Sequence, residues 1–408
     1  MDIETWFNTA DIKRHYFPGR IFVGAGVFRQ AIELCLQTEG QIAIVADQVV
    51  HDLPFVRDKL TALAHRGPHL KLVHGAPIAQ DVECFAQALG VAPAVILSIG
   101  GGSATDFAKA VTARFLFGAF DGIGLRGNIG ETKGRAKPIL VSVPTTAGSG
   151  AEASRYYVTY DRDDHHKVFG KSWQLVADWI MLDPIFLRSA PDSLLVSCAF
   201  DVFVHLFESM ICRYESSWMG RTLSLNGIPH LMDALDRVIH QGRRSDTEFS
   251  ALLETASIGG LAISNVRTGN IHEAAGALLE LTDLSHPETL FVFFRDAIEQ
   301  YLSQITDREQ ALLARLRLIP AFAQFARMDD VIRWWEALFA RVGLVERIRV
   351  SLDRLAPSQE TAKAHIFQRV FTDKVWITKE SPLPLDEAGI SGFIDRSLAR
   401  FGLAVETV

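Results

Sequence analysis

The first half of the chain alternates short apolar runs with stretches whose apolar residues recur at helical spacing, and no other feature constrains the fold as much. Strands that alternate with helices build a parallel sheet with helices on its faces, because parallel neighbours need a crossover connection. We therefore predict an α/β domain with a parallel sheet. The predicted strands are residues 21–24, 42–46, 70–74, 94–99, 139–143, 179–184 and, as part of a hairpin, 155–161.

The pattern changes after Pro191. From there to Val408 apolar residues recur at helical spacing with hardly any strand-like run, as in residues 252–261 and 332–342. The 408 residues are enough for two domains on a prior of about 150 residues each. We predict an α/β domain over residues 1–188 and an all-α domain over residues 189–408.

Composition excludes several classes of partner. The formal charge is −7, and no Lys/Arg run is longer than the pair Arg243-Arg244, so we expect no nucleic-acid partner. The N-terminus lacks a basic segment followed by an apolar one, and no run of about 18 uncharged apolar residues occurs, so we expect neither export nor a membrane. The four cysteines are spread singly, which fits a reducing cytoplasm.

Two loops at predicted strand ends are suited to a phosphate-bearing ligand. Gly100-Gly101-Gly102-Ser103 lies between a strand and a helix, where backbone N–H groups can approach a phosphate because no Cβ intervenes. A second loop, residues 144–149, follows another strand and adds hydroxyl groups. Each loop alone could be a plain tight turn, but two at the carboxyl ends of strands favour a dinucleotide and a Rossmann-like domain.

Asp47 indicates which dinucleotide binds. It ends the second predicted strand, 21 residues after Gly26, where a carboxylate can accept from the adenosine ribose 2′-OH and repel a 2′-phosphate. A turn aspartate at a strand end is the alternative, and Gly24-Ala25-Gly26 lacks the third glycine of the dinucleotide fingerprint. If a dinucleotide binds, we expect NAD(H) in preference to NADP(H).

Four side chains are candidates for one metal ion. Asp201 and His205 are spaced to share a helix face, and His272 and His286 lie fourteen positions apart further on. Three imidazoles and one carboxylate suit Fe²⁺ or Zn²⁺ and suit Ca²⁺ or Mg²⁺ poorly. Taken alone the grouping is weak, because an Asp four residues from a His is more often a locally paired couple.

An ordered series of motifs resembles the iron-containing (group III) alcohol dehydrogenases. Residues 100–109 are similar to that family's G-G-G-S-x-x-D-x-A-K loop, and residues 144–152 to its P-T-T-A-G-T-G-S-E motif. The resemblance implies a dehydroquinate synthase-like architecture, with an N-terminal dinucleotide-binding domain and a C-terminal helical metal-binding domain. The cofactor-binding positions it implies are Gly101, Gly102, Ser103, Asp106, Thr145, Thr146, Ser149, Ser154 near the nicotinamide, and Lys167 near its ribose.

The metal candidates match the same family. Asp201-x-x-x-His205 is similar to its D-A-L-x-H ligand pair, and His272 and His286 match its two later metal histidines with the family's spacing. The resemblance implies iron as the metal, and the ligand set also admits zinc.

Two departures leave the proton path and the substrate pocket open. Gly276 stands where the family has a histidine that is a candidate proton relay, and Ser285-His286-Pro287 stands where it has P-H-G. No catalytic residue is assigned; water acting through a ribose hydroxyl, Glu273 or another histidine are the substitutes.

The resemblance implies an oxidoreductase that interconverts a small alcohol and its aldehyde or ketone, with aldehyde reduction as the expected direction. Two alternatives remain: a dehydroquinate synthase-like cyclase or lyase that uses NAD transiently, and a catalytically silent homologue that binds cofactor or a partner protein. The expected partner is a small molecule, and a homodimer is only the default for such enzymes.

Overall fold

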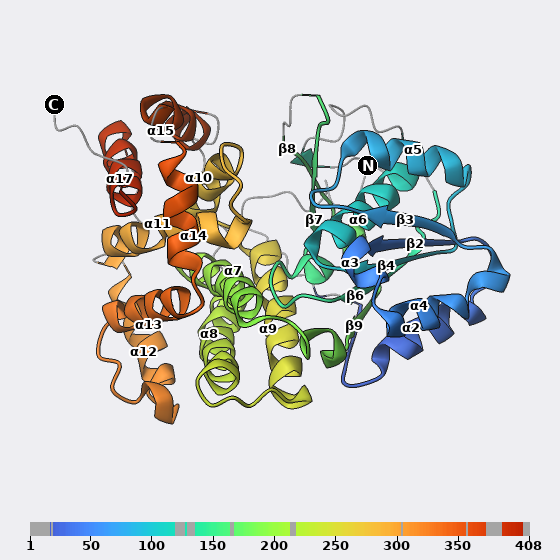
Figure 1. Ribbon diagram of the computed structural model, residues 1–408, viewed down its shortest axis with the longest axis horizontal. Coiled ribbons are helices and arrows are strands. Elements are labelled where there is room, and N and C mark those ends of the chain that lie inside the picture. Colours follow the sequence, from blue (N-terminus) through green and yellow to red (C-terminus); the bar gives the residue numbers. More distant parts are fainter. Residues whose placement is uncertain are drawn as a thin grey trace. The chain divides into compact units, whose positions relative to one another are not determined.

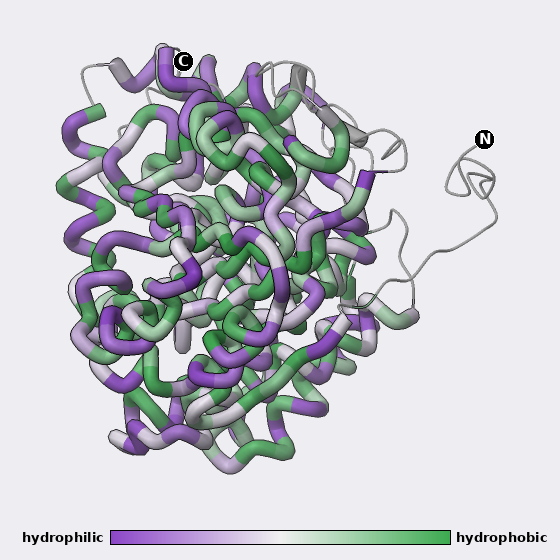
Figure 2. Tube along the Cα trace, turned by 90° about the vertical axis from the view of Figure 1, so that its right-hand side faces the viewer, coloured by the Kyte–Doolittle hydropathy of each residue, from purple (hydrophilic) through white to green (hydrophobic). Residues whose placement is uncertain are grey.

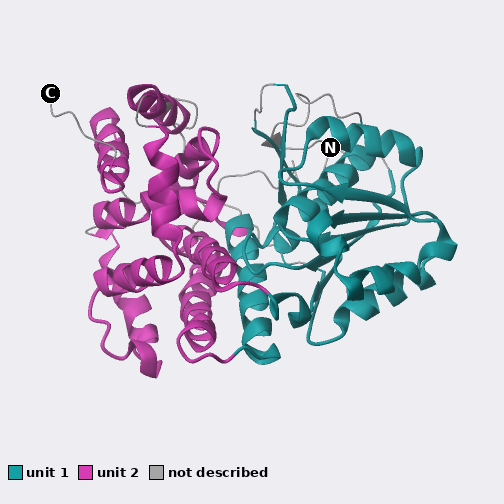
Figure 3. Cartoon of the chain, viewed as in Figure 1, with its two compact units in different colours: residues 1–189, 244–264 teal, residues 190–243, 265–408 magenta. Residues whose placement is uncertain are grey.

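The computed structural model describes residues 17, 19–118, 127–128, 135–163, 167–212, 218–302, 305–355, 358–372 and 386–402. The chain forms two compact units, coloured separately in Figure 3. The first comprises residues 1–189 and 244–264, and the second residues 190–243 and 265–408. The first unit thus takes in nearly all of helix α9 (Asp246–Asn265), which the predicted division at residue 188 assigns to the helical half. The division into a cofactor-binding and a metal-binding domain stays a prediction.

The first unit is built on a six-stranded parallel sheet, which confirms the predicted α/β domain. Helices α2 (Val27–Gln37) and α4 (Pro54–Thr61) cover one face, and α5 (Ala79–Leu89) and α6 (Gly102–Phe117) cover the other (Figure 1). In spatial order the strands are β1 (Arg20–Val23), β9 (Trp179–Leu182), β6 (Ile139–Pro144), β4 (Val95–Gly100), β2 (Ile42–Asp47) and β3 (His69–Val73).

The strand order reverses between β2 and β4. From β2 the chain crosses to β3 on one side, and it then returns to β4 on the other side. Both strands are almost wholly buried, as their continuous apolar runs require of parallel strands covered on both faces. Ligands of open α/β sheets bind outside the carboxyl ends of the strands at such a reversal, and these two strands end at Asp47 and Gly100.

A small second sheet also belongs to the first unit. The predicted hairpin strand is β7 (Tyr156–Tyr160), and it pairs antiparallel with β8 (Lys167–Lys171). Strand β8 was not predicted from the sequence, because its two lysines and Gly170 break the apolar alternation. Strand β5 (Gly127–Asn128) pairs parallel with β8.

The second unit is helical throughout the part that the structure describes, as the sequence predicts. Figure 2 shows hydrophilic and hydrophobic residues alternating along helical segments of the chain, the pattern of helices with one buried face. The helices that matter for the site are α7 (Asp192–Ile211), α10 (Asn270–Leu279) and α11 (His286–Tyr301). The others are α8 (Trp218–Ile239), α12 (Thr306–Leu316), α13 (Met328–Arg341), α14 (Leu344–Asp353), α15 (Gln359–Phe367) and α17 (Glu387–Ala399).

Helix α7 is the core of this unit. The ring of its Phe200 packs edge-on against four buried aromatic rings of α11 and α13, namely Phe291, Phe294, Trp335 and Phe339. Each such pair contributes about 0.5–1.5 kcal/mol beyond its buried area. By length and composition α7 is the one described helix that could span a membrane by itself, and the bent pair of α9 and α10 passes the same test only if it is counted as one span. Of the apolar window of α7, 89% is buried inside the fold. Its hydropathy is therefore accounted for by core packing.

Candidate active site

Helix α7 carries three ionisable side chains on one buried face. Asp201 and His205 lie four residues apart, and Glu208 follows three residues later, so all three project from the same side of the helix. Each of the three side chains is buried. An aspartate and a glutamate that are buried on an apolar helix require partners, because an unpaired charge away from water is costly.

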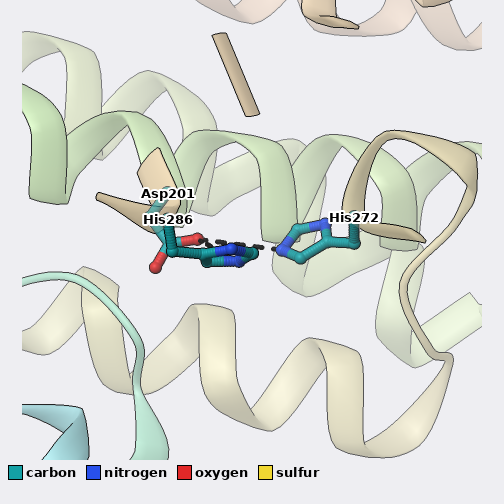
Figure 4. Close-up of side chains that lie close together, drawn as sticks. All are labelled: Asp201, His272 and His286. Carbon is teal, nitrogen blue, oxygen red and sulfur yellow. Dashed lines mark ion pairs between the residues drawn. The ribbon is translucent and has the colours of Figure 1, made fainter. Parts of the chain in front are cut away.

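His272 and His286 reach this face from the first turns of two other helices. His272 is the third residue of α10, and His286 is the first residue of α11. The Nε2 atoms of His205, His272 and His286 lie 3.6, 3.7 and 3.9 Å from Oδ1 of Asp201. Figure 4 shows the side chains of Asp201, His272 and His286 directed toward one another.

The donor atoms of this group are spaced to share one ion. One ligand atom each from Asp201, His272 and His286 lies within 4.8 Å of the others. His205 lies beside them, with its ring stacked on His272 at 4.7 Å between centroids. A tetrahedral ion with ligand distances of about 2.1 Å separates its donors by roughly 3.4 Å, close to the distances measured from Asp201.

The hydrogen bonding of the group also fits an ion. Oδ1 of Asp201 and Nε2 of His272 are buried, and neither has a hydrogen-bond partner among the described residues. Buried polar atoms without a partner are rare in folded proteins and call for an explanation. A divalent cation would satisfy both atoms, so the residues present fit the iron or zinc that the sequence predicts.

Burial and charge act against each other on these groups. Burial alone would raise the pKa of Asp201, but the three neighbouring imidazoles hold it well below its usual range. Burial lowers the pKa of His205 to about 4 despite Asp201, so this ring is neutral at pH 7. Burial would also lower the pKa of His272, but Glu208 and Asp201 raise it to about 9. His272 must therefore lose a proton before Nε2 can bind a metal.

Glu208 belongs to the site although sequence reasoning missed it. Oε2 of Glu208 accepts a hydrogen bond from Nδ1 of His272 at 2.6 Å. Its position, seven residues after Asp201 on an apolar helix, was the available signal, because that spacing returns to the same face after two turns. A lone acid at that spacing does not reveal its partner in the sequence.

The departure at Ser285-His286-Pro287 has a structural explanation. Ser285 is the N-cap of α11, and its N–H and hydroxyl both donate to Oε2 of Glu288, at 2.7 and 2.6 Å. Pro287 lies in the first turn, where its missing N–H costs nothing. This capping box fixes the helix start at His286, so the changed sequence still presents the histidine.

Gly276 lies one helical turn after His272 on α10. A side chain at this position would stand on the same helix face as the metal candidate, so the glycine leaves that face without the relay histidine that the resemblance implies. Glu273 follows His272 in the first turn of α10. The proton path stays unassigned.

The glycine loop of the first unit lies close against the side chains of Asp47, Thr146 and Ser149. Gly100 has a φ of +157°, and a Cβ there would lie 2.4 Å from Oδ2 of Asp47. A Cβ on Gly101 would lie 3.0 Å from Oγ1 of Thr146, and one on Gly102 would lie 2.8 Å from Oγ of Ser149. The two predicted cofactor loops and Asp47 therefore converge at the carboxyl ends of β2, β4 and β6.

Asp47 is held against this loop by a hydrogen bond. Its Oδ2 accepts from the N–H of Gly101 at 2.7 Å. The contact follows from the pairing of β2 with β4, not from the spacing to Gly26 noted in the sequence. The first turn of α2, which follows Gly26, is already occupied: Oδ2 of Asp183 accepts from the N–H groups of Gly26 and Phe28 at 2.9 and 3.1 Å.

Ser154 belongs to a hydrogen-bond network around Lys109, and Asp106, three residues earlier on α6, attracts Lys109 electrostatically. The Lys109 ammonium is fully buried and donates to the carbonyl groups of Ala151, Ser154 and Tyr156. Asp106 accepts from the N–H of Val158 at 3.0 Å. The network fixes the chain that follows the second cofactor loop; whether Asp106, Ser154 and Lys167, the first residue of β8, contact a cofactor stays a prediction.

Comparison with known proteins agrees with these features. The sequence model described as "Iron-containing alcohol dehydrogenase" matches residues 18–184. The 4-hydroxybutyrate dehydrogenase of Clostridium kluyveri is 23% identical over 210 residues, which are 50% of this chain and 54% of that protein. The sulfoacetaldehyde reductase of Bilophila wadsworthia is 26% identical over 263 residues, which are 63% of this chain and 67% of that protein. The chain thus spans about half of the first relative's length.

The fold is similar over nearly the whole chain. A crystal structure of 1,3-propanediol oxidoreductase has a TM-score of 0.79 at 18% identity, and it covers 95% of this chain and 100% of its own. An alcohol dehydrogenase from Oenococcus oeni has a TM-score of 0.79 at 19% identity, with the same coverage. At such identity the likeness concerns the fold. Residues 18–184 thus match the iron-containing alcohol dehydrogenase model, and the chain as a whole has the fold of these solved alcohol dehydrogenases.

Proposed function

We propose that this protein is a metal-dependent, NAD(P)(H)-linked oxidoreductase that interconverts a small alcohol and its aldehyde or ketone, with aldehyde reduction as the working direction. The observation that carries the proposal is the convergence of Asp201, His272 and His286, with one donor atom each within 4.8 Å. The relatives named as dehydrogenases and reductases support it. The cysteines are spread singly and none forms a disulfide, which supports action in the cytoplasm.

The proposed metal ligands are Asp201, His205, His272 and His286. An ion bound there supplies Lewis-acid stabilisation of the negative charge that develops on the substrate oxygen. The protein contributes the donor geometry and a largely dry surrounding, because three of the four side chains are less than a tenth exposed. His286 is 32% exposed and is the side from which solvent or substrate can reach the group.

The proposed cofactor is NAD(H), bound at the carboxyl ends of β2 and β4. Helix α6 begins at Gly102, within the glycine loop, and its N-terminus offers N–H groups and the helix dipole to a pyrophosphate. The proposed contacts are those that the resemblance implies. Asp47 at the end of β2 would accept from the adenosine ribose hydroxyl and repel a 2′-phosphate.

The direct test is an aldehyde screen on protein purified without oxygen. Elemental analysis should find a divalent transition metal, and NADH oxidation at 340 nm should depend on an added aldehyde. The panel should include short neutral aldehydes and short aldehydes with a carboxylate or sulfonate. Bound metal without turnover of any aldehyde would favour the catalytically silent homologue. NAD-dependent conversion of a substrate without net NADH oxidation would favour the cyclase or lyase.

Replacing Asp47 by Asn is expected to raise the NADPH-to-NADH ratio of kcat/KM by roughly tenfold, which corresponds to about 1.4 kcal/mol of removed repulsion. Asparagine keeps an oxygen that can accept from the Gly101 N–H, so the loop should keep its shape. Steady-state kinetics with both cofactors checks this. Asp58→Asn, an exposed aspartate on α4, is the control and should leave the ratio unchanged. An unchanged ratio in Asp47→Asn would remove Asp47 from the cofactor site.

The same preference should depend on pH. Burial raises the pKa of the Asp47 carboxyl, against the effect of the Gly101 N–H, so the group becomes neutral at a higher pH than an ordinary aspartate. The NADPH-to-NADH ratio of the native protein should therefore rise as pH falls from neutral toward acid. In Asp47→Asn only the titration of the 2′-phosphate remains, so the NADPH-to-NADH ratio of this variant should change less steeply with pH. Equal slopes in the two proteins would contradict the assignment.

A further inference from the structure

Glu208 is the buried carboxylate beside the metal candidates that the proposed ligand set does not use. Its side chain is 2% exposed. Oε2 accepts from the N–H of Gly269 at 2.7 Å and from Nδ1 of His272 at 2.6 Å, and Oε1 accepts from the N–H of Ile271 at 2.8 Å. One carboxylate of α7 therefore binds two backbone donors and one imidazole of the same short segment.

The backbone contacts hold the start of α10. Gly269 is the N-cap of this helix and has no side chain to cap it, so Glu208 satisfies the N–H groups of the first turn from a neighbouring helix. A Cβ on Gly269 would lie 2.9 Å from Oε1 of Glu208, so any other residue there would displace the carboxylate from this position. The turn that Glu208 anchors is the turn that carries His272.

The contact with the ring decides which nitrogen is available. An ionised carboxylate can only accept hydrogen bonds, so Nδ1 of His272 must carry the proton that it shares with Oε2. In a neutral ring this leaves the lone pair on Nε2, the atom 3.7 Å from Oδ1 of Asp201. We propose that Glu208 is a positioning residue that holds His272 in the tautomer and orientation required for metal binding. The proposal rests on the proposed metal site.

Glu288 offers a matched comparison. It is fully buried, and like Glu208 it accepts hydrogen bonds at the start of a helix that presents a metal histidine. Its described partners are Ser285 and Arg347, and no hydrogen bond joins it to an imidazole in the described structure. Replacing Glu288 therefore weakens a helix cap without changing the proton position of a ligand ring.

The experiment compares Glu208→Gln with Glu288→Gln in the full chain, with Zn²⁺ as the probe and a chromophoric chelator as the competitor. The side-chain N–H₂ group of glutamine can face either the N–H of Ile271 or the N–H of Gly269 together with the His272 ring. In the second arrangement Nδ1 of His272 must accept a hydrogen bond, and Nε2 of His272 must carry the proton. Glu208→Gln should bind Zn²⁺ about 10–100-fold more weakly than the native protein. The Zn²⁺ affinity of Glu288→Gln should stay within about threefold of the native value. Urea unfolding of the metal-free proteins measures the loss of stability in each.

The outcomes separate the two proposals. Zn²⁺ affinity in Glu208→Gln equal to that of the native protein, or an equal loss in both variants, would overturn the role of Glu208 while leaving the metal site in place. A native protein that binds no Zn²⁺ or Fe²⁺ would overturn the metal site itself and the inference with it.

A second measurement needs no variant at Glu208. Nitrogen-15 NMR of the Zn²⁺-loaded native protein reports the protonation of each ring nitrogen, and the His272 resonances are assigned by their absence from His272→Asn. The proposal requires a protonated Nδ1 that is hydrogen-bonded and an unprotonated Nε2. A protonated Nε2 on His272 would overturn it even if Glu208→Gln does not fold.

Discussion

Replacing His272 by Ala is expected to abolish both the retention of a divalent metal and NADH-linked aldehyde reduction. The change removes one of the three converging donors and leaves Glu208 without its ring partner. Loss of Lewis-acid stabilisation raises the free energy of the transition state by several kcal/mol, so the rate should fall by about 10³-fold or more. Elemental analysis after anaerobic purification gives the metal content, and absorbance at 340 nm gives the turnover.

The matched control is His230→Ala. His230 is an exposed histidine on α8 in the same unit, so its loss removes an imidazole without touching the candidate ligands. Metal content and turnover should stay at the native level. Full activity in His272→Ala would rule the proposed mechanism out.

Replacing Lys109 by Met is expected to cost about 3–5 kcal/mol in the free energy of unfolding, because breaking a buried charge network leaves its remaining groups uncompensated. Burial lowers the pKa of Lys109 and raises the pKa of Asp106, and the attraction between the two opposite charges acts against both shifts. The variant leaves the carbonyl groups of Ala151, Ser154 and Tyr156 without their donor. Urea unfolding measures the loss.

A double-mutant cycle tests the cause. If Asp106 and Lys109 stabilise each other as a buried pair, Asp106→Asn combined with Lys109→Met should destabilise the protein by less than the sum of the single variants. The variants should also raise the KM for NADH, because the turn after the second cofactor loop loses its anchor. Strict additivity, or a loss below about 1 kcal/mol for Lys109→Met, would contradict this account of the network.

The fold could be predicted because its signals are local. The strands β2 and β4 are continuous apolar runs that end at Asp47 and at the glycine loop, and a run of that length between helical stretches indicates a buried parallel strand. Strand β8 could not be found in this way, because its stability comes from pairing with β7 and not from its own composition. The position of α9 in the first unit depends on long-range contacts that leave no periodic signal. One of these contacts is the hydrogen bond from Ser257 to Glu152 at 2.6 Å.

The candidate site was predictable only in part. The four metal candidates could be named because their spacing and order carry the resemblance, and the structure brings three of them together with His205 alongside. The capping box at residues 285–288 has the S-x-x-E pattern and could have been recognised from the sequence. The partners of Glu208 could not be recognised from the sequence, because Glu208 and His272 are 64 residues apart.

The loop at Gly26 shows how a motif can mislead. Its glycines and the distance to Asp47 resemble a dinucleotide fingerprint, but the carboxylate of Asp183 already binds the N–H groups that a phosphate would need. A distant acid of this kind is invisible to a local motif. The loop after β4 is the better candidate for the phosphate site, because the N-terminus of α6 begins in it and the hydroxyl groups of Thr146 and Ser149 lie beside it. Asp47 accepts from one N–H of this loop, that of Gly101.

The most direct measurement is metal removal and restoration on a single preparation of the native protein. Turnover of NADH with an active aldehyde should disappear when a chelator removes the bound ion, and it should return in proportion to the Fe²⁺ or Zn²⁺ that binds again. One ion per chain is expected at full activity. Undiminished NADH oxidation by metal-free protein would contradict the proposed metal dependence.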